Sequence, residues 1–168
     1  MTVYPLARAS HCVGESNFHI QLTVAYRRPI FADPRVARLT KAYMLAKAEG
    51  LGIAIAHMGF GPDHLHFFAM NCRRYGVDQL VGLIKGFTSR MMRKNHSKLI
   101  RHMLWGGKFW TGGYFYRSVG RVTTENMEYY IEHAQRKHWD IVDEEFYVHA
   151  NGQSSIEQFV DPQGFSPG

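Results

Sequence analysis

Cysteine is nearly absent from this chain, which has only Cys12 and Cys72 among its 168 residues. Two cysteines match no zinc-binding pattern and are too few for a disulfide scaffold, so a reduced cytoplasmic protein is expected. Long apolar runs are also missing: no stretch could span a membrane, and residues 1–8 lack the apolar core of a signal peptide. No internal repeat is present. These absences argue against a secreted, membrane-spanning or zinc-finger protein.

Acidic residues are in the minority, because 20 Lys and Arg residues face 14 Asp and Glu and leave a net charge of +6. The isoelectric point near 9.4 favours polyanionic partners, nucleic acid in particular. A hydrophobic fraction of 45% argues for a folded chain. The length of 168 residues suits one domain with a substantial core.

Two of the ten histidines flank a single leucine in residues 62–68, Pro-Asp-His-Leu-His-Phe-Phe. Side chains alternate along a strand, so His64 and His66 are expected on one face and Leu65 in the core. Two imidazoles on one face form half of a metal site. In a chain with ten histidines such a pair also arises by chance, so its spacing alone does not establish a metal site. His19 and His57 are interpreted as structural histidines.

Strand and helix signals alternate along the rest of the chain. The predicted elements are a strand over 18–26, a helix from 34 through 47, strands over 53–60 and 64–70 joined by a turn at 61–63, a helix over 77–95, an irregular segment over 96–108, a glycine-broken strand over 109–119 and a helix from about 123 to 139. Residues 1–17 are expected to form an arm or a short edge strand. Two strand-helix-strand units around an antiparallel sheet predict an α/β (α+β) fold, a ferredoxin-like or RRM-like sandwich.

The two long helices carry clear end signals. Asp33 suits the N-cap of the first, with Pro34 at its first helical position, and Gly50 or Gly52 suits its end. The helix over 77–95 has an apolar stripe and an opposite basic face. That basic face is either solvated or a phosphate-binding surface.

Several short motifs occur in the order typical of one enzyme family. They are Phe18-His19-Ile20, Tyr26-Arg27-Arg28-Pro29, Pro62-Asp63-His64-Leu65-His66, Lys85-Gly86-Phe87-Thr88-Ser89-Arg90, Leu104-Trp105, Phe109-Trp110, Gly113-Tyr114-Phe115, Ser118-Val119-Gly120 and Tyr130-Ile131-Glu132. In series they resemble the small insertion-sequence transposases that have a HUH (His-hydrophobic-His) motif and one catalytic tyrosine. The resemblance predicts a transposase domain over 1–139, with 1–17 as its arm, and a partly disordered C-terminal extension over 140–168.

The resemblance implies cleavage and rejoining of single-stranded DNA. A tyrosine would attack the scissile phosphate and form a 5′-phosphotyrosine, leaving a free 3′-OH. The two HUH histidines, with a polar residue on the tyrosine's helix, would hold Mg²⁺ or Mn²⁺. It further implies recognition of DNA hairpins near the element's ends, a homodimer, no membrane, and a cytoplasmic, nucleoid-associated place in a prokaryotic cell.

The tyrosine motif departs from the family pattern Tyr-Ile-x-x-Gln. Aligning Tyr130 with the family tyrosine puts Ala134 at the glutamine position, and alanine cannot bind a metal. On a regular helix of about 100° per residue, His133 lies roughly 60° from Tyr130 and Gln135 roughly 140° away. His133 is therefore the predicted third ligand, with Gln135 as the runner-up. Tyr130 is the predicted nucleophile, and Tyr129 is the alternative.

Six basic residues are predicted contacts for DNA phosphates. They are Arg27, Arg28, Lys85, Arg90, Arg93 and Arg117. Three other functions stay open: a domesticated relative that nicks repeats in its host genome, a replication or relaxation nickase, and a non-catalytic module that binds single-stranded DNA. The departure at Ala134 favours the last of these.

Overall fold

The computed structural model describes residues 6–104 and 106–120. Its elements follow the chain as β1 (Ala7–Ala9), β2 (Cys12–Gly14), β3 (Asn17–Thr23), the short 3-10 turns η1 (Ala25–Arg27) and η2 (Ile30–Ala32), α1 (Pro34–Leu51), β4 (Ala54–Phe60), β5 (His64–Met70), α2 (Val77–Asn95), α3 (Ser97–Ile100) and β6 (Phe115–Val119). The helix predicted over 123–139 lies outside the described residues. The domain boundary at 139 and 140 therefore stays a prediction.

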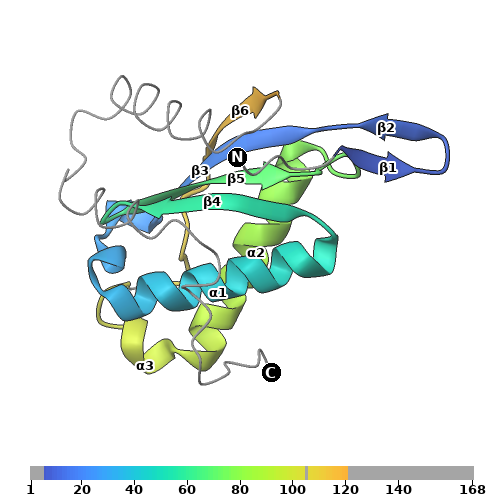
Figure 1. The fold of residues 1–168 in the computed structure, drawn as a ribbon. Helices are drawn as coiled ribbons and strands as arrows, with labels where there is room; N and C mark the ends of the chain where they lie inside the picture. Colours follow the sequence, from blue (N-terminus) through green and yellow to red (C-terminus); the bar gives the residue numbers. More distant parts are fainter. Residues whose placement is uncertain (1–5, 105, 121–168) are drawn as a thin grey trace.

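The central feature is a four-stranded antiparallel sheet with the strand order β4-β5-β3-β6. Helices α1 and α2 lie on one face of this sheet, as Figure 1 shows. Counted from β3, the strands and helices follow one another as β-α-β-β-α-β. The predicted ferredoxin-like α/β sandwich is therefore confirmed.

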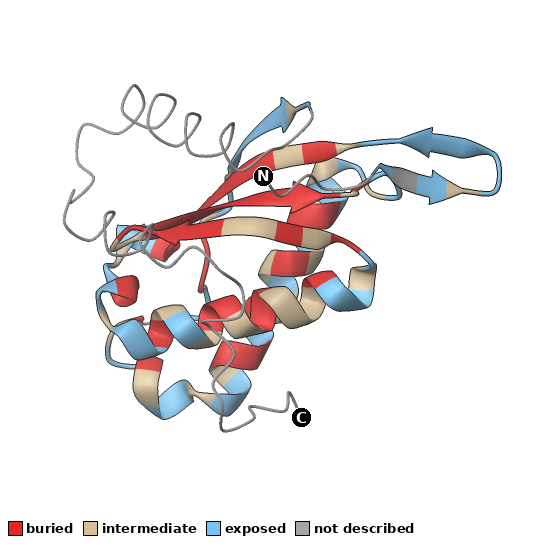
Figure 2. Ribbon diagram, viewed as in Figure 1, coloured by how far each residue is buried: buried red, intermediate tan, exposed pale blue. Residues whose placement is uncertain are grey.

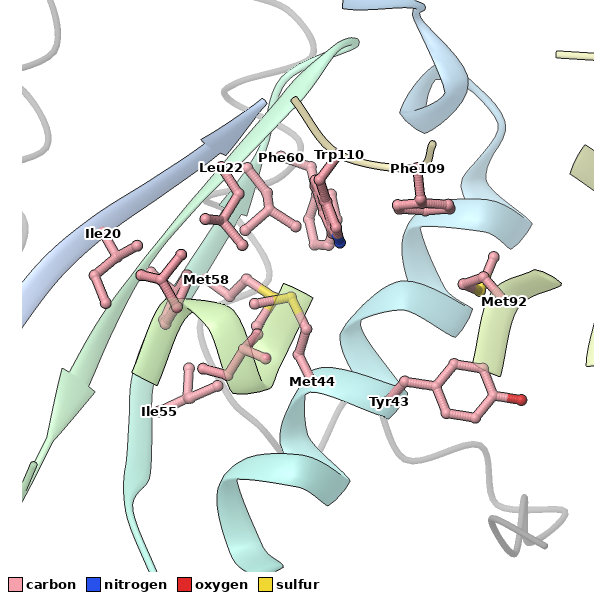
Figure 3. Packing of buried hydrophobic residues seen from close by; sticks show 14 of the residues in the cluster. Ile20, Leu22, Tyr43, Met44, Ile55, Met58, Phe60, Met92, Phe109 and Trp110 are labelled. Carbon is pink, nitrogen blue, oxygen red and sulfur yellow. The ribbon is translucent and has the colours of Figure 1, made fainter. Parts of the chain in front are cut away.

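The hydrophobic core fills the space between the sheet and the two helices (Figures 2 and 3). Ile20 and Leu22 reach it from β3, Met44 from α1, and Met92 from α2. Each of these four side chains is fully buried. Burial of such side chains stabilises the fold by about 1.5–3 kcal/mol each relative to exposure.

The predicted ends of both long helices are confirmed. The carboxylate of Asp33 accepts a hydrogen bond from the backbone N–H of Arg35, and Pro34 opens α1. Gly52 ends α1 with φ of 69°, a left-handed conformation that glycine adopts without steric cost. Helix α2 spans the residues that were predicted for it, Val77–Asn95.

Three predicted segments were wrong in part. The N-terminal arm is a β1–β2 hairpin that projects beyond the main sheet (Figure 1). The strand predicted over 109–119 begins only at Phe115, and the ammonium group of Lys85 binds the backbone carbonyls of residues 111–113 before it. Trp110 forms one isolated antiparallel β-bridge with Val24. Within the segment predicted to be irregular, residues 97–100 form α3.

A β-bulge in β4 was not predicted. Ile55 pairs with Ala69, but His57, two residues later, pairs with Phe68. The extra residue reverses the alternation, so Ile55 faces the core while His57 faces the other side of the sheet. Of the helices in the described part of the chain, none is long and apolar enough to span a membrane.

Candidate active site

His64 and His66 lie on the face of the sheet that points away from α1 and α2. The residues between and after them, Leu65 and Phe67, belong to the hydrophobic core, so strand alternation sends both imidazoles to the opposite face. Both side chains are buried, with His64 3% and His66 1% exposed. The structure therefore confirms that the two histidines share a face.

The turn before β5 fixes the backbone position of His64, the first residue of that strand. Its residues make three backbone hydrogen bonds: Gly61 N–H to the carbonyl of His64 at 2.9 Å, Val24 N–H to the carbonyl of Asp63 at 2.8 Å, and Phe31 N–H to the carbonyl of Pro62 at 3.0 Å. These bonds tie the turn to the end of β3 and to η2. The first metal-ligand candidate thus sits on a rigid corner of the sheet.

A carboxylate holds the ring of His64. Nδ1 of His64 lies 2.8 Å from Oδ1 of Asp63, and Oδ2 of the same carboxylate accepts a hydrogen bond of 2.9 Å from Nε of Arg27. Burial acts to raise the pKa of Asp63, but the hydrogen bonds from His64 and Arg27 outweigh it and lower that pKa below its usual value. Asp63 is therefore ionised at neutral pH. Sequence reasoning placed it only in a turn.

Two glycines make room for the two rings. A Cβ atom on Gly59 would lie 2.3 Å from Nε2 of His66, and one on Gly61 would lie 2.2 Å from Cε1 of His64. Contacts this short do not occur between real atoms, so any other residue at these positions would displace a ring. The cross-strand pairing of Gly59 with His66 explains why the sequence needs glycine there.

His19 and His57 surround His66 in a way that the sequence did not predict. Their ring centroids lie 5.6 and 5.9 Å from that of His66. Burial, with help from Arg117 and His57, lowers the pKa of His19 to about 4. Burial also lowers the pKa of His66 well below its usual value, with smaller contributions from His19, His57 and His64. Buried imidazoles of this kind are neutral at pH 7, which is the state that binds metals.

The pairing of β3 with β5 could have revealed this cluster. His19 lies in a strand whose alternate residues, Ile20 and Leu22, are apolar, so it belongs to the same face as Gln21. Gln21 is the cross-strand partner of His66, and Thr23 is that of His64. In the part of the chain that the structure describes, no group of three or more His, Cys, Asp or Glu side chains is arranged to hold a metal ion.

The six predicted phosphate contacts fall into two groups. Arg27 and Arg117 lie on the histidine side: Arg27 through Asp63, and Arg117 opposite His19. The other four are Arg28, Lys85, Arg90 and Arg93. Three of these four donate to backbone carbonyls: Arg28 to Met103, Lys85 to residues 111–113, and Arg93 to Lys108.

Helix α2 carries Lys85, Arg90 and Arg93 and packs on the core side of the sheet. The sheet therefore separates these three residues from the histidines. Arg90 lies over the ring of Phe87, 6.0 Å from its centroid. The role of these side chains as DNA contacts stays a prediction.

The predicted nucleophile and third ligand lie outside the described residues. This applies to Tyr130 and its alternative Tyr129, to His133 and Gln135, and to Ala134. Their assignments stay predictions. The described part of the site consists of two imidazoles with fixed rings and the polar groups around them.

Comparison with known proteins identifies the family. The sequence model of the family described as "Transposase IS200 like" matches residues 12–134. A curated relative, the ISDra2 transposase TnpA of Deinococcus radiodurans, is 27% identical over 120 residues, which are 71% of this chain and 84% of that protein.

A solved structure shares the fold, and a second aligns less closely. A crystal structure of a candidate transposase from Deinococcus radiodurans R1 aligns with a TM-score of 0.61 and 23% identity over 76% of this chain and 96% of that one. A REP-associated tyrosine transposase bound to a REP hairpin aligns with a TM-score of 0.48 and 14% identity over 84% of this chain and 76% of that one. The family match spans most of the chain and includes both histidines of the site, and the chain therefore belongs to the IS200-like transposases.

Proposed function

We propose that this transposase cleaves and rejoins single-stranded DNA at the ends of an insertion sequence through a 5′-phosphotyrosine intermediate. The observation that carries the proposal is the pair His64 and His66 on one sheet face, with rings held by Asp63 and by two glycines. Phosphoryl transfer requires fixed positive charge beside the scissile phosphate. A preorganised pair of imidazoles is suited to hold a cation there.

The donor set fits a divalent metal in part. His64 and His66 supply two imidazole nitrogen ligands, and the proposed third ligand is His133, with Gln135 as the alternative. A bound Mg²⁺ or Mn²⁺ would neutralise charge on the non-bridging phosphate oxygens. Imidazole pairs also suit zinc, so the choice of Mg²⁺ or Mn²⁺ rests on the family resemblance.

The proposed nucleophile is the hydroxyl of Tyr130. Its oxygen would form a bond to phosphorus as it loses its proton, while the bond from phosphorus to the 3′ oxygen breaks and that oxygen takes up a proton. A phenolate is a good leaving group because the pKa of tyrosine is about 10, so a DNA 3′-OH can reverse the reaction. Rejoining thus needs no external energy source.

The proposed substrate is single-stranded DNA with hairpin ends, and its recognition rests on the resemblance. Arg27 and Arg117 are the basic residues best placed to meet a strand that approaches the histidines. Such an enzyme would act at the nucleoid of a prokaryotic cell.

A homodimer is part of the proposal. Strand β6 is an edge of the sheet, and its residues Phe115 and Tyr116 are large and exposed. An edge strand with exposed aromatic side chains is suited to pair with another chain. The measurement that tests this is the molar mass in solution as a function of protein concentration.

One competing function has support in the sequence. Ala134 stands where the family has its glutamine, which favours a module that binds single-stranded DNA without cutting it. The host-repeat nickase and the replication or relaxation nickase share the same chemistry, so the active site does not separate them from a transposase.

The decisive experiment looks for the covalent adduct. The protein is incubated with Mn²⁺ and a hairpin DNA labelled at its 3′ end, because that end stays with the 5′-phosphotyrosine. Wild type is expected to give a labelled protein band. Binding of the hairpin with no band under Mg²⁺ or Mn²⁺ would establish the binding module instead.

Substitutions on the tyrosine helix test the individual roles. Tyr130→Phe is expected to abolish the band and keep hairpin binding, whereas a band that survives would transfer the role to Tyr129. His133→Ala is expected to weaken metal-dependent cleavage more than Gln135→Ala does. The reverse ranking would make Gln135 the third ligand.

A further inference from the structure

The side chains of Arg27, Asp63 and His64 form a hydrogen-bonded chain that ends at the metal-ligand candidate. Nε of Arg27 lies 2.9 Å from Oδ2 of Asp63, and Oδ1 lies 2.8 Å from Nδ1 of His64. We propose that Asp63, held by Arg27, is a positioning residue that keeps the proton of His64 on Nδ1 and so directs the lone pair of Nε2 to the ligand. The last step, from Nε2 to a metal, rests on the proposed function.

The tautomer follows from the chemistry of the partner. An ionised carboxylate only accepts hydrogen bonds, so the ring nitrogen beside it must carry the proton. In a neutral imidazole the other nitrogen then holds the lone pair. Carboxylates that orient metal-binding histidines in this way fix both the tautomer and the direction of the ring.

The ring has little freedom to leave this arrangement. His64 is 3% exposed, and Gly61 supports it so closely that a Cβ there would lie 2.7 Å from each ring nitrogen. The backbone of Asp63 is itself fixed by the hydrogen bond from Val24. The carboxylate of Asp63 therefore contacts an imidazole ring, that of His64, whose position is already fixed by packing.

The backbone conformation at Tyr26 and Arg27 supports a functional role for the contact between Arg27 and Asp63. Tyr26 and Arg27 have φ values of 58° and 52°, in the left-handed region that residues other than glycine rarely adopt. Two strained residues in succession are unusual, and such strain tends to gather at functional sites. Here the strained segment delivers the guanidinium of Arg27 to the carboxylate of Asp63.

Asp63→Asn makes the idea testable, because Arg27 decides how the new amide lies. Nε of Arg27 is a donor, so it selects the amide oxygen and turns the NH₂ group toward Nδ1 of His64. Nδ1 must then accept, and the proton moves to Nε2. Asp33→Asn is a matched control: Asp33 also pairs with an arginine, Arg35, at 2.7 Å, and asparagine caps a helix as well as aspartate.

The first measurement needs no metal. Nitrogen-15 NMR of histidine-labelled full-length protein in EDTA reports which ring nitrogen of His64 carries the proton, with His64→Gln used to assign its signals. We expect Nδ1–H in wild type and in Asp33→Asn, and Nε2–H in Asp63→Asn. A wild-type ring protonated on Nε2 would overturn the proposal, even if Asp63→Asn failed to fold.

The second measurement titrates Mn²⁺ and follows the free ion by electron paramagnetic resonance. Asp63→Asn should bind Mn²⁺ about 10–100-fold more weakly than wild type, and Asp33→Asn should bind as wild type does. Unchanged affinity in Asp63→Asn would overturn the link from tautomer to metal. If wild type bound no Mn²⁺, the metal step of the proposed function would fail, and the NMR result would still decide the role of Asp63.

Discussion

At the scale of single residues, the absence of a side chain is as important as the presence of one. The Cβ of Gly59→Ala would lie 2.3 Å from Nε2 of His66, whose side chain is buried. We expect this variant to lose about 1–3 kcal/mol of stability through overpacking. We also expect its Mn²⁺ affinity to fall at least about 10-fold, as for a displaced ligand. Chemical denaturation and Mn²⁺ titration measure the two effects.

Gly82→Ala is the control for this variant. Gly82 is an exposed residue of α2, and a Cβ there meets nothing within 4 Å. Alanine in a helix interior is more stable than glycine by about 1 kcal/mol. This variant should therefore gain stability and bind Mn²⁺ as wild type does. Equal losses in both variants would contradict the role given to Gly59.

The two thiols should differ sharply in reactivity. Burial raises the pKa of Cys72 to about 12, whereas Cys12 is exposed on β2. Because the thiolate is the reactive form, we expect Ellman's reagent at pH 8 to modify one thiol in the native protein and two in guanidinium chloride. Modification of two thiols without denaturant would contradict the burial of Cys72.

Sequence reasoning found some residues of the site and missed others for a physical reason. His64 and His66 were predicted because strand alternation is a local property. The sequence does not predict that His57 shares a face with His66, because this depends on a bulge, and the bulge has no sequence signal of its own. Asp63 was assigned to a turn because its contact with His64 depends on a side-chain rotamer.

At the scale of elements, cationic side chains of α2 hold the loop that follows α3. The ammonium group of Lys85 lies 2.6 Å from the carbonyl oxygen of Thr111 and reaches those of Gly112 and Gly113 at 3.2 and 3.3 Å. Lys85→Met should lower the free energy of unfolding by about 1 kcal/mol, because hydrogen bonds from a partly exposed charged group are weakened by solvent. Thermal melting in EDTA measures this change.

Lys94→Met is the control, since Lys94 is exposed near the end of the same helix. It should change the melting temperature little. If Lys85→Met melted as wild type does and instead reduced the salt dependence of DNA binding, the phosphate-contact prediction would be right and the loop role wrong.

The elements themselves were largely predictable. Helix α2 and the β4–β5 hairpin carry strong local signals in the form of apolar periodicity, capping residues and a Gly-Pro turn. The start of β6 was predicted too early because Phe109 and Trp110 resemble strand residues. Both side chains are buried in the core instead, and the hydrogen bonds from Lys85 to residues 111–113 come from an element distant in sequence.

At the scale of the whole molecule, the buried histidines should make the fold sensitive to acid. The pKa of His19 is lowered to about 4 by burial, and then by Arg117 and His57, while an unfolded histidine titrates near 6.5. Between these values the unfolded state binds more protons than the native state, so stability rises with pH and falls on acidification. His19 alone accounts for up to about 3 kcal/mol.

His19→Phe keeps a ring beside Phe68, whose centroid lies 4.9 Å from that of His19. Its unfolding free energy, measured in EDTA from pH 7 to pH 4, should therefore fall less steeply than that of wild type. The burial of His66 leaves a residual slope. Parallel curves for the two proteins would show that His19 does not titrate in this range.

The sandwich architecture was predictable because β-α-β-β-α-β order restricts the possible topologies. The complete site stays a prediction, since its proposed tyrosine and third ligand lie outside the described residues and far in sequence from the HUH strand. Local patterns report which face a residue takes within its own strand. They do not report which distant side chains meet it.

The bulge between Ile55 and His57 gives β4 one residue more than the segment of β5 that lies opposite it. Deletion of Ala56 would make the pairing regular, because Ile55 and His57 would then be consecutive and already face the consecutive residues Ala69 and Phe68, so every side chain would keep its present face. The bulge thus lets β4 hold one additional residue while Met58 stays in the core and His57 stays beside His66.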